Sequence, residues 1–309
     1  STIALKDQGP EADELAPFAK DQILIGILNP NGARDLIKAY AAQGLTSFAM
    51  EFMPRITRAQ TMDVLSSQSN LSGYKAVLDA AAEYGRALPM MMTAAGTIAA
   101  ARVFIMGAGV AGLQAVATAK RLGAIVSATD VRLAAKEQVE SLGGKFVMVQ
   151  DDEAKEAETA GGYAKEMSDA YKQKQAALVA ETIKKQDIVI TTALIPGRPA
   201  PRLITAAMVR SMKPGSVIVD LAVEQGGNVE GSKPGEIVDI DGVKIVGHIN
   251  VPSRLATDAS ALYAKNLVNF LTPLVDAEAK TLKIDWDDDI VKGVLVTKDG
   301  GVVHPALQS

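Results

Sequence analysis

The clearest pattern near the start of the chain is a pair of apolar runs separated by a helical segment. Residues 22–28 (QILIGIL) are almost entirely apolar and are followed by turn-forming residues, and residues 45–52 form a second apolar run. Between them, residues 33–43 have helical periodicity and end at Gly44, a residue type that commonly terminates helices. We therefore expect a strand, a helix and a second strand here, and no regular element in the polar residues 1–20.

A long helix is predicted after this unit. From residue 61 to residue 87, apolar side chains recur at steps of three and four, and the pattern stops before Pro89, which cannot continue a helix. A helix of this length is expected to connect two domains.

Residues 88–251 have the pattern of a doubly wound domain. Short apolar runs alternate with helical segments, and about six strands are expected among them. The strands are predicted at residues 102–106, 124–129, 146–149, 187–192, 217–221 and 243–246, and the helices at residues 110–122 and 134–142.

One connection in this region is unusually long. Residues 151–185 are mostly polar and contain Gly161, Gly162 and Tyr163, although they lie between two predicted strands. Loops longer than about 15 residues are usually functional or disordered. Residues 151–167 are therefore expected to form a mobile loop that closes over a ligand.

The last part of the chain is expected to return to the first domain. A helix at residues 258–274 and two weak strands near residues 282–284 and 291–296 are too few to bury a core alone. The predicted fold is therefore α/β with two Rossmann-like doubly wound domains, of which the first is discontinuous. The expected division is residues 1–65 and 252–309 for the first domain, residues 61–87 for the linking helix and residues 88–251 for the second domain.

Composition narrows the chemistry. The 309 residues have a net charge of −4 and no basic run interleaved with aromatics, so no nucleic-acid partner is expected. Disulfides and thiolate catalysis are excluded because there is no cysteine, and the only two histidines, His248 and His304, lie too far apart for a His-pair metal motif. For the same reason no metal site is expected. The apolar tract at residues 88–119 is interrupted by Arg102, four glycines and a proline, so no direct membrane insertion is expected either.

The strongest chemical motif is the turn Gly107-Ala108-Gly109-Val110-Ala111-Gly112 after the predicted strand RVFIM. In a turn of this kind Gly107 makes the tight bend, Gly109 lets the backbone approach a pyrophosphate, and Gly112 lets the helix pack close to the strand. The N–H groups at the start of the following helix then face the phosphates, so Ala108 and Val110 are included in the candidate site. Three such glycines alone also fit a flexible turn.

Asp130 supports the nucleotide interpretation. It stands at the end of the next predicted strand, 18 residues after Gly112, where a carboxylate can accept hydrogen bonds from both ribose hydroxyls of adenosine. Such a carboxylate repels a 2′-phosphate and favours NAD over NADP, although Arg132 in the same Asp130-Val131-Arg132 segment is a residue type that can reverse this preference.

Other polar residues give no site by themselves. Arg55, Arg58, Gln60 and Asp63 are typical of a solvated loop before a helix, and Gly161-Gly162-Tyr163 is typical of a surface turn. His248, at a predicted strand end, is expected to be a hydrogen-bonded structural residue and not an acid or base.

Taken together, several segments resemble the NAD(H)-binding component of the proton-translocating nicotinamide nucleotide transhydrogenases. The glycine turn is shared with the more distant alanine dehydrogenases, whereas MPRITRAQTMD and AETAGGYAKEM are specific to this family. The resemblance spans residues 45–309 and is loose before that, so the first domain is expected to be truncated or divergent at its start. The matching segments include AMEFMPRITRAQTMDVLSSQSNLSGYKAV, GAGVAGLQAVATAKRLGAIVSATDVR, AETAGGYAKEM, ITTALIPGRPAP and GVKIVGHINVPSR.

The resemblance implies roles for individual residues. Arg55, Gln60 and Asp63, with Ser66 beside them, match the family's loop around the nicotinamide, and Asp130 matches the acceptor of the adenosine ribose. The other implied cofactor contacts are Tyr163 and Gly162 on the mobile loop, and Ala193 and Leu194 after the fourth strand.

The implied reaction is direct hydride transfer from NADH to NADP⁺, which needs no general acid or base and so suits a chain with few histidines. The implied partners are an NADP(H)-binding domain, a membrane-spanning proton-channel domain and a second copy of this chain. The implied location is the cytoplasmic or matrix face of the inner membrane, peripheral to it through these partners.

Two alternatives stay open. An alanine dehydrogenase-like amino-acid oxidoreductase would need a lysine and a histidine in its first domain, and no histidine precedes His248. The other is a non-catalytic NAD(H)-binding module that senses redox state without turnover, and the long loop at residues 151–167 and the polar segment around Arg55 argue against it.

Overall fold

The computed structural model describes residues 2–149, 168–195 and 197–308. The chain divides into two compact units, Ser1–Gln68 with Thr257–Ser309, and Ser69–Ala256. The expected mobile loop, with Gly162 and Tyr163, lies outside the described residues. Within those residues, no helix combines the length and the apolar character needed to cross a membrane, and no group of three or more acidic or histidine side chains could hold a metal ion.

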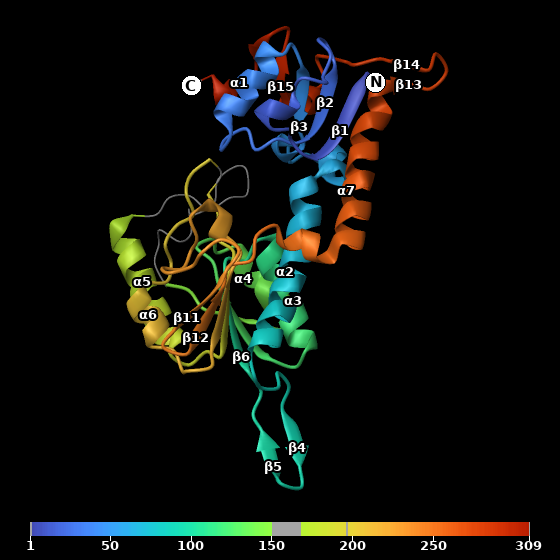
Figure 1. Ribbon diagram of the computed structural model, residues 1–309. Helices are drawn as coiled ribbons and strands as arrows, with labels where there is room; N and C mark the ends of the chain where they lie inside the picture. The colour runs from blue at the N-terminus through green and yellow to red at the C-terminus, as the bar shows by residue number, and fades with distance from the viewer. Residues whose placement is uncertain (1, 150–167, 196, 309) are drawn as a thin grey trace. The chain divides into compact units, whose positions relative to one another are not determined.

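The first unit is built on a five-stranded sheet with the order β1-β2-β3-β15-β16 (Figure 1). The first three strands are parallel, whereas β15 runs antiparallel to β3 and β16 antiparallel to β15. Alternate residues of the apolar central strands pack on opposite faces, so both faces are covered. The strands are β1 (Ile3–Gln8), β2 (Ile23–Ile27), β3 (Thr46–Ala49), β15 (Leu295–Lys298) and β16 (Gly301–Val302).

Helices cover the two faces of this sheet. Tyr40 on α1 (Arg34–Ala42) is buried on one face, and Phe270 on α7 (Ala256–Leu271) is buried on the other, where its ring meets that of Phe48 edge-on at 5.7 Å. These packed faces give the unit its own hydrophobic core.

Two expectations for the first unit were wrong. Residues 3–8 form a strand where no element was expected. Residues 291–296 were expected to be a strand, but Asp289–Val294 forms a helix, α8, and the strand begins only at Leu295. The carboxylate of Asp288 accepts the N–H of Ile290 and caps this helix, whose branched residues are buried at helical spacing.

The second unit contains a seven-stranded sheet with the order β11-β12-β10-β9-β6-β7-β8. All neighbouring pairs are parallel except the edge pair β11 and β12. The strand order therefore reverses between β6 and β9, which is where open α/β sheets bind ligands. The strands are β6 (Arg102–Met106), β7 (Ile125–Thr129), β8 (Lys145–Phe146), β9 (Ile188–Thr191), β10 (Val217–Asp220), β11 (Ile237–Ile240) and β12 (Val243–Val246).

Helices pack on both faces of this sheet (Figure 1). Val103 and Ile105 of β6 face α2 (Val64–Glu83) and α3 (Val110–Arg121), whereas Phe104 and Met106 face the opposite layer. Among the residues of this unit that the structure describes, the other helices are α4 (Ala135–Ser141), α5 (Asp169–Ile183) and α6 (Ala206–Arg210). The helix α5 lies in the polar stretch 151–185, after the residues 151–167 that were expected to form a loop, and was not predicted.

A two-stranded hairpin, β4 (Met91–Thr93) and β5 (Gly96–Ile98), extends away from this sheet (Figure 1). This hairpin was not predicted, whereas the strand at residues 102–106 and the helix at residues 110–122 expected in the same apolar tract are present as β6 and α3. Met92 is 79% exposed, so the apolar side chains of the hairpin lie outside the core.

Candidate functional site

The glycine turn connects β6 to α3 at the switch point of the second sheet. Gly107 has a φ of 101°, and a Cβ on it would lie 2.5 Å from Oγ1 of Thr192, whose hydroxyl donates to the Gly107 carbonyl at 3.0 Å. A Cβ on Gly112 would lie 1.8 Å from that carbonyl oxygen. Both positions therefore need glycine for the fold itself: Gly107 because of its positive φ and the neighbouring Thr192 side chain, and Gly112 because the helix and the strand touch there through their backbones.

Gly109 differs from these two glycines. Its φ of −77° suits any residue, and no atom lies within 4 Å of the place where a Cβ would stand. It begins α3, and no side chain caps the first N–H groups of the helix. The position can accommodate an anion such as a pyrophosphate.

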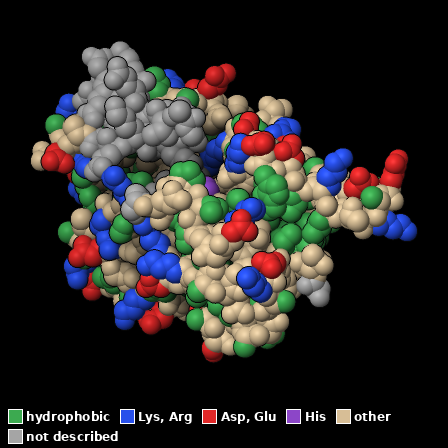
Figure 2. Space-filling view, turned by 90° about the horizontal axis from the view of Figure 1, so that it is seen from above, with side chains coloured by type: hydrophobic (Ala, Val, Ile, Leu, Met, Phe, Trp, Pro, Cys, Tyr) green, Lys and Arg blue, Asp and Glu red, His purple; other side chains and the backbone are tan. Residues whose placement is uncertain are grey.

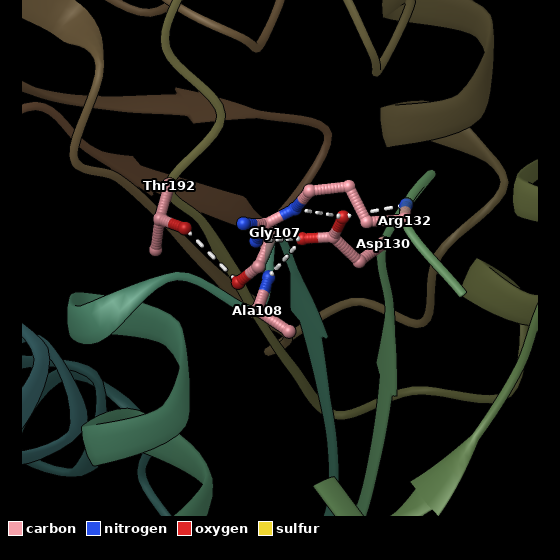
Figure 3. A network of polar contacts seen from close by, with 5 residues as sticks. All are labelled: Gly107, Ala108, Asp130, Arg132 and Thr192. Carbon is pink, nitrogen blue, oxygen red and sulfur yellow. Dashed lines mark hydrogen bonds and ion pairs between the residues drawn. The ribbon is translucent and has the colours of Figure 1, made fainter. Parts of the chain in front are cut away.

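Asp130 follows β7 and lies beside the turn (Figure 3). The N–H of Ala108 donates to its Oδ2 at 2.8 Å, and the N–H of Arg132 donates to its Oδ1 at 2.8 Å. The Arg132 guanidinium also donates from Nε to Oδ1 at 2.9 Å and from Nη2 to Oδ2 at 3.0 Å. The predicted ribose acceptor is thus fixed against the glycine turn, and Arg132 is paired with it.

The segment after β9 lies next to the turn through the Thr192 contact. The N–H of Ala193 donates to Oδ1 of Asn228 at 3.0 Å, and the Asn228 amide returns a hydrogen bond to the Ala193 carbonyl at 2.9 Å. The fully buried Asp220 in turn accepts the N–H groups of Ala222 and Asn228. These contacts place Ala193 and the exposed Leu194 at the carboxyl end of the sheet, and no sequence pattern had pointed to Asn228.

The residues matched to the nicotinamide loop belong to the first unit. Arg55 and Gln60 are exposed on a segment that continues into a 3₁₀ turn at Thr57–Met62, and Asp63 follows it. The Asp63 carboxylate accepts the N–H of Ser66 at 3.0 Å and its hydroxyl at 2.5 Å, so it caps the first turn of α2.

This segment is fixed by contacts that are distant in sequence. The Arg58 guanidinium donates twice to the Asp288 carboxylate, at 2.6 and 3.1 Å. The side-chain amides of Asn266 and Asn269 donate to the Thr61 carbonyl at 2.8 and 2.9 Å. Arg58, to which the sequence assigned no role, therefore acts as an anchor for the segment around Arg55 and Gln60.

Both histidines have a lowered pKa. Burial lowers the pKa of His248, and the nearby Arg254 lowers it further. Burial also lowers the pKa of His304, whose Nδ1 accepts the N–H of Ala306, so its Nε2 donates to the Gly293 carbonyl.

A groove of about 340 Å³ lies at the amino ends of strands in the second sheet. Its lining includes Arg102, Ile125 and Lys145, the first residues of β6, β7 and β8. The glycine turn lies at the carboxyl ends of the strands, so this groove is separate from the candidate nucleotide site.

Figure 2 shows basic and acidic side chains interspersed on the visible face.

Comparisons with known proteins cover nearly the whole chain. Residues 1–72 match the family model described as "Alanine dehydrogenase/PNT, N-terminal domain", and residues 76–305 match "Alanine dehydrogenase/PNT, C-terminal domain". The chain is 62% identical over 295 residues to the first part of the NAD(P) transhydrogenase alpha subunit of Rhodospirillum rubrum, a match that covers 96% of this chain and 77% of that protein.

Two solved structures extend this similarity to the fold. A transhydrogenase from Sinorhizobium meliloti superposes with a TM-score of 0.88 at 59% identity, covering 98% of this chain and 81% of that one. An L-alanine dehydrogenase superposes with a TM-score of 0.77 at 25% identity, covering 100% of this chain and 80% of that one. Both matches span both units of the chain.

Proposed function

The chain belongs to the alanine dehydrogenase/PNT family and groups there with the alpha subunits of NAD(P) transhydrogenase, and on this premise we propose that it binds NAD(H) and presents the nicotinamide for direct hydride transfer to NADP⁺ on a partner domain. The observation on which this proposal rests is the joint geometry of the glycine turn and Asp130. An open helix start and a fixed carboxylate at the switch point of the sheet suit the pyrophosphate and the ribose of one dinucleotide.

The residues of the second unit fit NAD(H). Gly109 leaves space for the pyrophosphate, the first N–H groups of α3 can donate to it, and Asp130 can accept the ribose hydroxyls. A 2′-phosphate beside the Asp130 carboxylate would meet like charge in a position that is only 8% exposed, which favours NAD over NADP. When bound, the dinucleotide supplies the hydride from C4 of its nicotinamide.

We propose that Arg55 and Gln60 hold the nicotinamide end, with Asp63 and Ser66 fixing their segment. The family resemblance supports these roles, and it also supports closure of the site by Tyr163 and Gly162. The anchoring of the segment through Arg58 and Thr61 favours a preorganised contact, and orientation is the main contribution a protein can make to hydride transfer.

The same resemblance supports three proposed partners: an NADP(H)-binding domain, a membrane-spanning proton-channel domain and a second copy of the chain. The membrane-spanning domain would hold this chain at the cytoplasmic or matrix face. The exposed hairpin supports a homodimer, because Met90, Met91 and Met92 are 56%, 40% and 79% exposed. Adjacent exposed methionines are costly in water and are typical of a protein interface.

We expect hydride transfer only in the presence of the partner. Purified chain should bind about one NADH per polypeptide, should bind NADPH at least about tenfold more weakly, a difference of ~1.4 kcal/mol, and should sediment as a dimer. NADH oxidation in the presence of NADP⁺ should begin when the purified NADP(H)-binding domain is added, as measured by absorbance of the dihydronicotinamide. Oxidation of alanine or reduction of pyruvate by the chain alone would instead support the alanine dehydrogenase alternative, and failure of transfer with partner present would support a binding module.

Gln60→Asn tests the proposed nicotinamide contact. The variant keeps the amide but shortens its reach, so we expect partner-dependent hydride transfer to fall at least about tenfold, which is ~1.4 kcal/mol of transition-state stabilisation. NADH affinity should change less than about threefold, because the adenosine and pyrophosphate contacts are intact. The matched control is Gln43→Asn, whose amide donates to the Phe18 carbonyl in the first unit. An equal loss in transfer and binding would remove Gln60 from the nicotinamide site.

A further inference from the structure

The Asp130 carboxylate is saturated by donors from the chain itself. An ionised carboxylate offers about four lone-pair directions, two on each oxygen. Oδ1 accepts the N–H and Nε of Arg132, and Oδ2 accepts the N–H of Ala108 and Nη2 of Arg132 (Figure 3). In this arrangement neither oxygen has a direction left for a ribose hydroxyl.

We propose that the Arg132 side chain occupies the ribose-binding positions of Asp130 from within the chain, so that NAD(H) binds only when this guanidinium leaves the carboxylate. Arg132 is then a determinant of nucleotide affinity that acts by competition. The inference rests on the proposed function, because it concerns the same adenosine end of the same site.

The two kinds of donor differ in how easily they can leave. The N–H of Ala108 belongs to the glycine turn, whose backbone is fixed by β6, α3 and Thr192. The N–H of Arg132 lies two residues from Asp130 on the main chain. The guanidinium, by contrast, is at the end of a side chain with several rotatable bonds that is 17% exposed. The two backbone donors would therefore remain and hold the carboxylate in place, while the two guanidinium bonds are exchanged for two ribose hydroxyl bonds.

This competition lowers the apparent affinity for any ligand with an adenosine ribose. Asp130 is 7% and Arg132 17% exposed at the side chain, so their pairing is poorly screened by water. When only a fraction of the protein molecules is in the binding-competent state, the apparent affinity of the ligand is reduced by that fraction. Removal of the guanidinium should accordingly strengthen binding, although it removes a cation from the neighbourhood of a negatively charged ligand.

The test is a double-mutant cycle on the whole chain with ADP and NADH as probes, measured by titration calorimetry. Arg132→Met keeps length and removes every side-chain donor, and we expect it to bind both probes about five- to tenfold more tightly than the unmodified chain. Arg132→Lys, which keeps the charge but has one ammonium in place of the two-pronged contact, should give a smaller gain and serves if the first variant does not fold. Arg121→Met, an exposed arginine near the end of α3, is the control and should leave both affinities unchanged.

The background variant Asp130→Asn separates this inference from the proposed function. If Arg132 acts through Asp130, Arg132→Met should give no gain in the Asp130→Asn background. A gain of the same size there, or weaker binding by Arg132→Met in the original background, would overturn the inference while leaving NAD(H) binding intact. The proposed function itself would fail if the unmodified chain did not bind NADH or if Asp130→Asn left ADP and NADH affinities unchanged.

Discussion

Alanine at position 112 is expected to destabilise the second unit and to abolish nucleotide binding with it. The added Cβ would stand 1.8 Å from the Gly107 carbonyl oxygen, where the backbones of β6 and α3 meet. No side chain can move away to relieve this contact, so the helix must shift from the strand. We expect a loss of at least about 3 kcal/mol in the free energy of unfolding, the upper range for overpacked positions, measured by urea denaturation.

Gly109→Ala is the matched control, because it changes the same turn without the clash. No atom lies within 4 Å of the position that its Cβ would take, so the free energy of unfolding should change by less than about 0.5 kcal/mol. NADH affinity should nevertheless fall at least about tenfold, because the methyl group would stand where the pyrophosphate approaches the backbone. Normal NADH binding by this variant would place the pyrophosphate elsewhere, and normal stability of Gly112→Ala would contradict the close packing of helix and strand.

The contrast between the two glycines also marks what the sequence could predict. The motif identified the turn and its place between a strand and a helix, because buried parallel strands have uninterrupted apolar runs that stand out from polar surroundings. The spacing to Asp130 could be predicted for the same reason. That a Cβ meets backbone at Gly112 and open space at Gly109 depends on the packing of α3 on β6, which no local pattern contains.

The elements that sequence missed are those with little buried surface. The strand β1 lies at a sheet edge and is only partly buried, so its residues IALKDQ are as polar as a loop. In α5 only Tyr171, Val179 and Ile183 are buried, which is too sparse to give an amphipathic pattern. The error at α8 had the opposite cause, because its β-branched residues suggested a strand while the Asp288 cap and helical burial decided the helix.

The contacts of the candidate site were still less accessible from sequence. Asp288 is 230 positions from Arg58, and Asn266 is 205 positions from Thr61, so their pairing exists only in the folded chain. The pairing of Arg132 with Asp130 is local, yet the sequence left open whether this arginine would face the carboxylate or a 2′-phosphate. In the structure its guanidinium donates to the carboxylate, a side-chain conformation that no sequence pattern contains.

A buried cluster of charges in the second unit leads to the second large expected effect. Asp79 on α2 is 5% exposed and accepts hydrogen bonds from Nζ of Lys75 at 2.5 Å and from Nε and Nη2 of Arg254 at 3.1 and 3.0 Å. Burial alone would raise the pKa of Asp79, but the hydrogen bonds from Arg254 and Lys75 outweigh it and hold the pKa below its usual value. The carboxylate is thus ionised at neutral pH, and its single negative charge pairs with two cations.

Asp79→Asn should therefore cost about 3 kcal/mol of stability at pH 7, because it keeps the shape of the side chain while leaving Lys75 and Arg254 close together without their anion. The comparison is Glu83→Gln, which removes the more exposed ion pair of Glu83 with Lys244 and should cost less than about 1 kcal/mol. Both are measured by denaturant unfolding of the same preparation.

The pH dependence distinguishes charge pairing from simple packing at this cluster. A carboxylate whose folded pKa is lowered stabilises the protein fully above its unfolded pKa of about 3.9, and this contribution is lost as the pH falls through the folded pKa. The difference between the unmodified chain and Asp79→Asn should thus be constant between about pH 7 and 8 and should shrink below about pH 4. Burial and Arg254 lower the pKa of His248, whereas Asp79 raises it, so Asp79→Asn lowers the His248 pKa further and the difference should first widen as the pH falls below about 6.5. A difference that persisted undiminished to pH 3 would mean that Asp79 contributes packing and not charge. If Asp79→Asn cost no more stability than Glu83→Gln, the cluster would not be a source of stability.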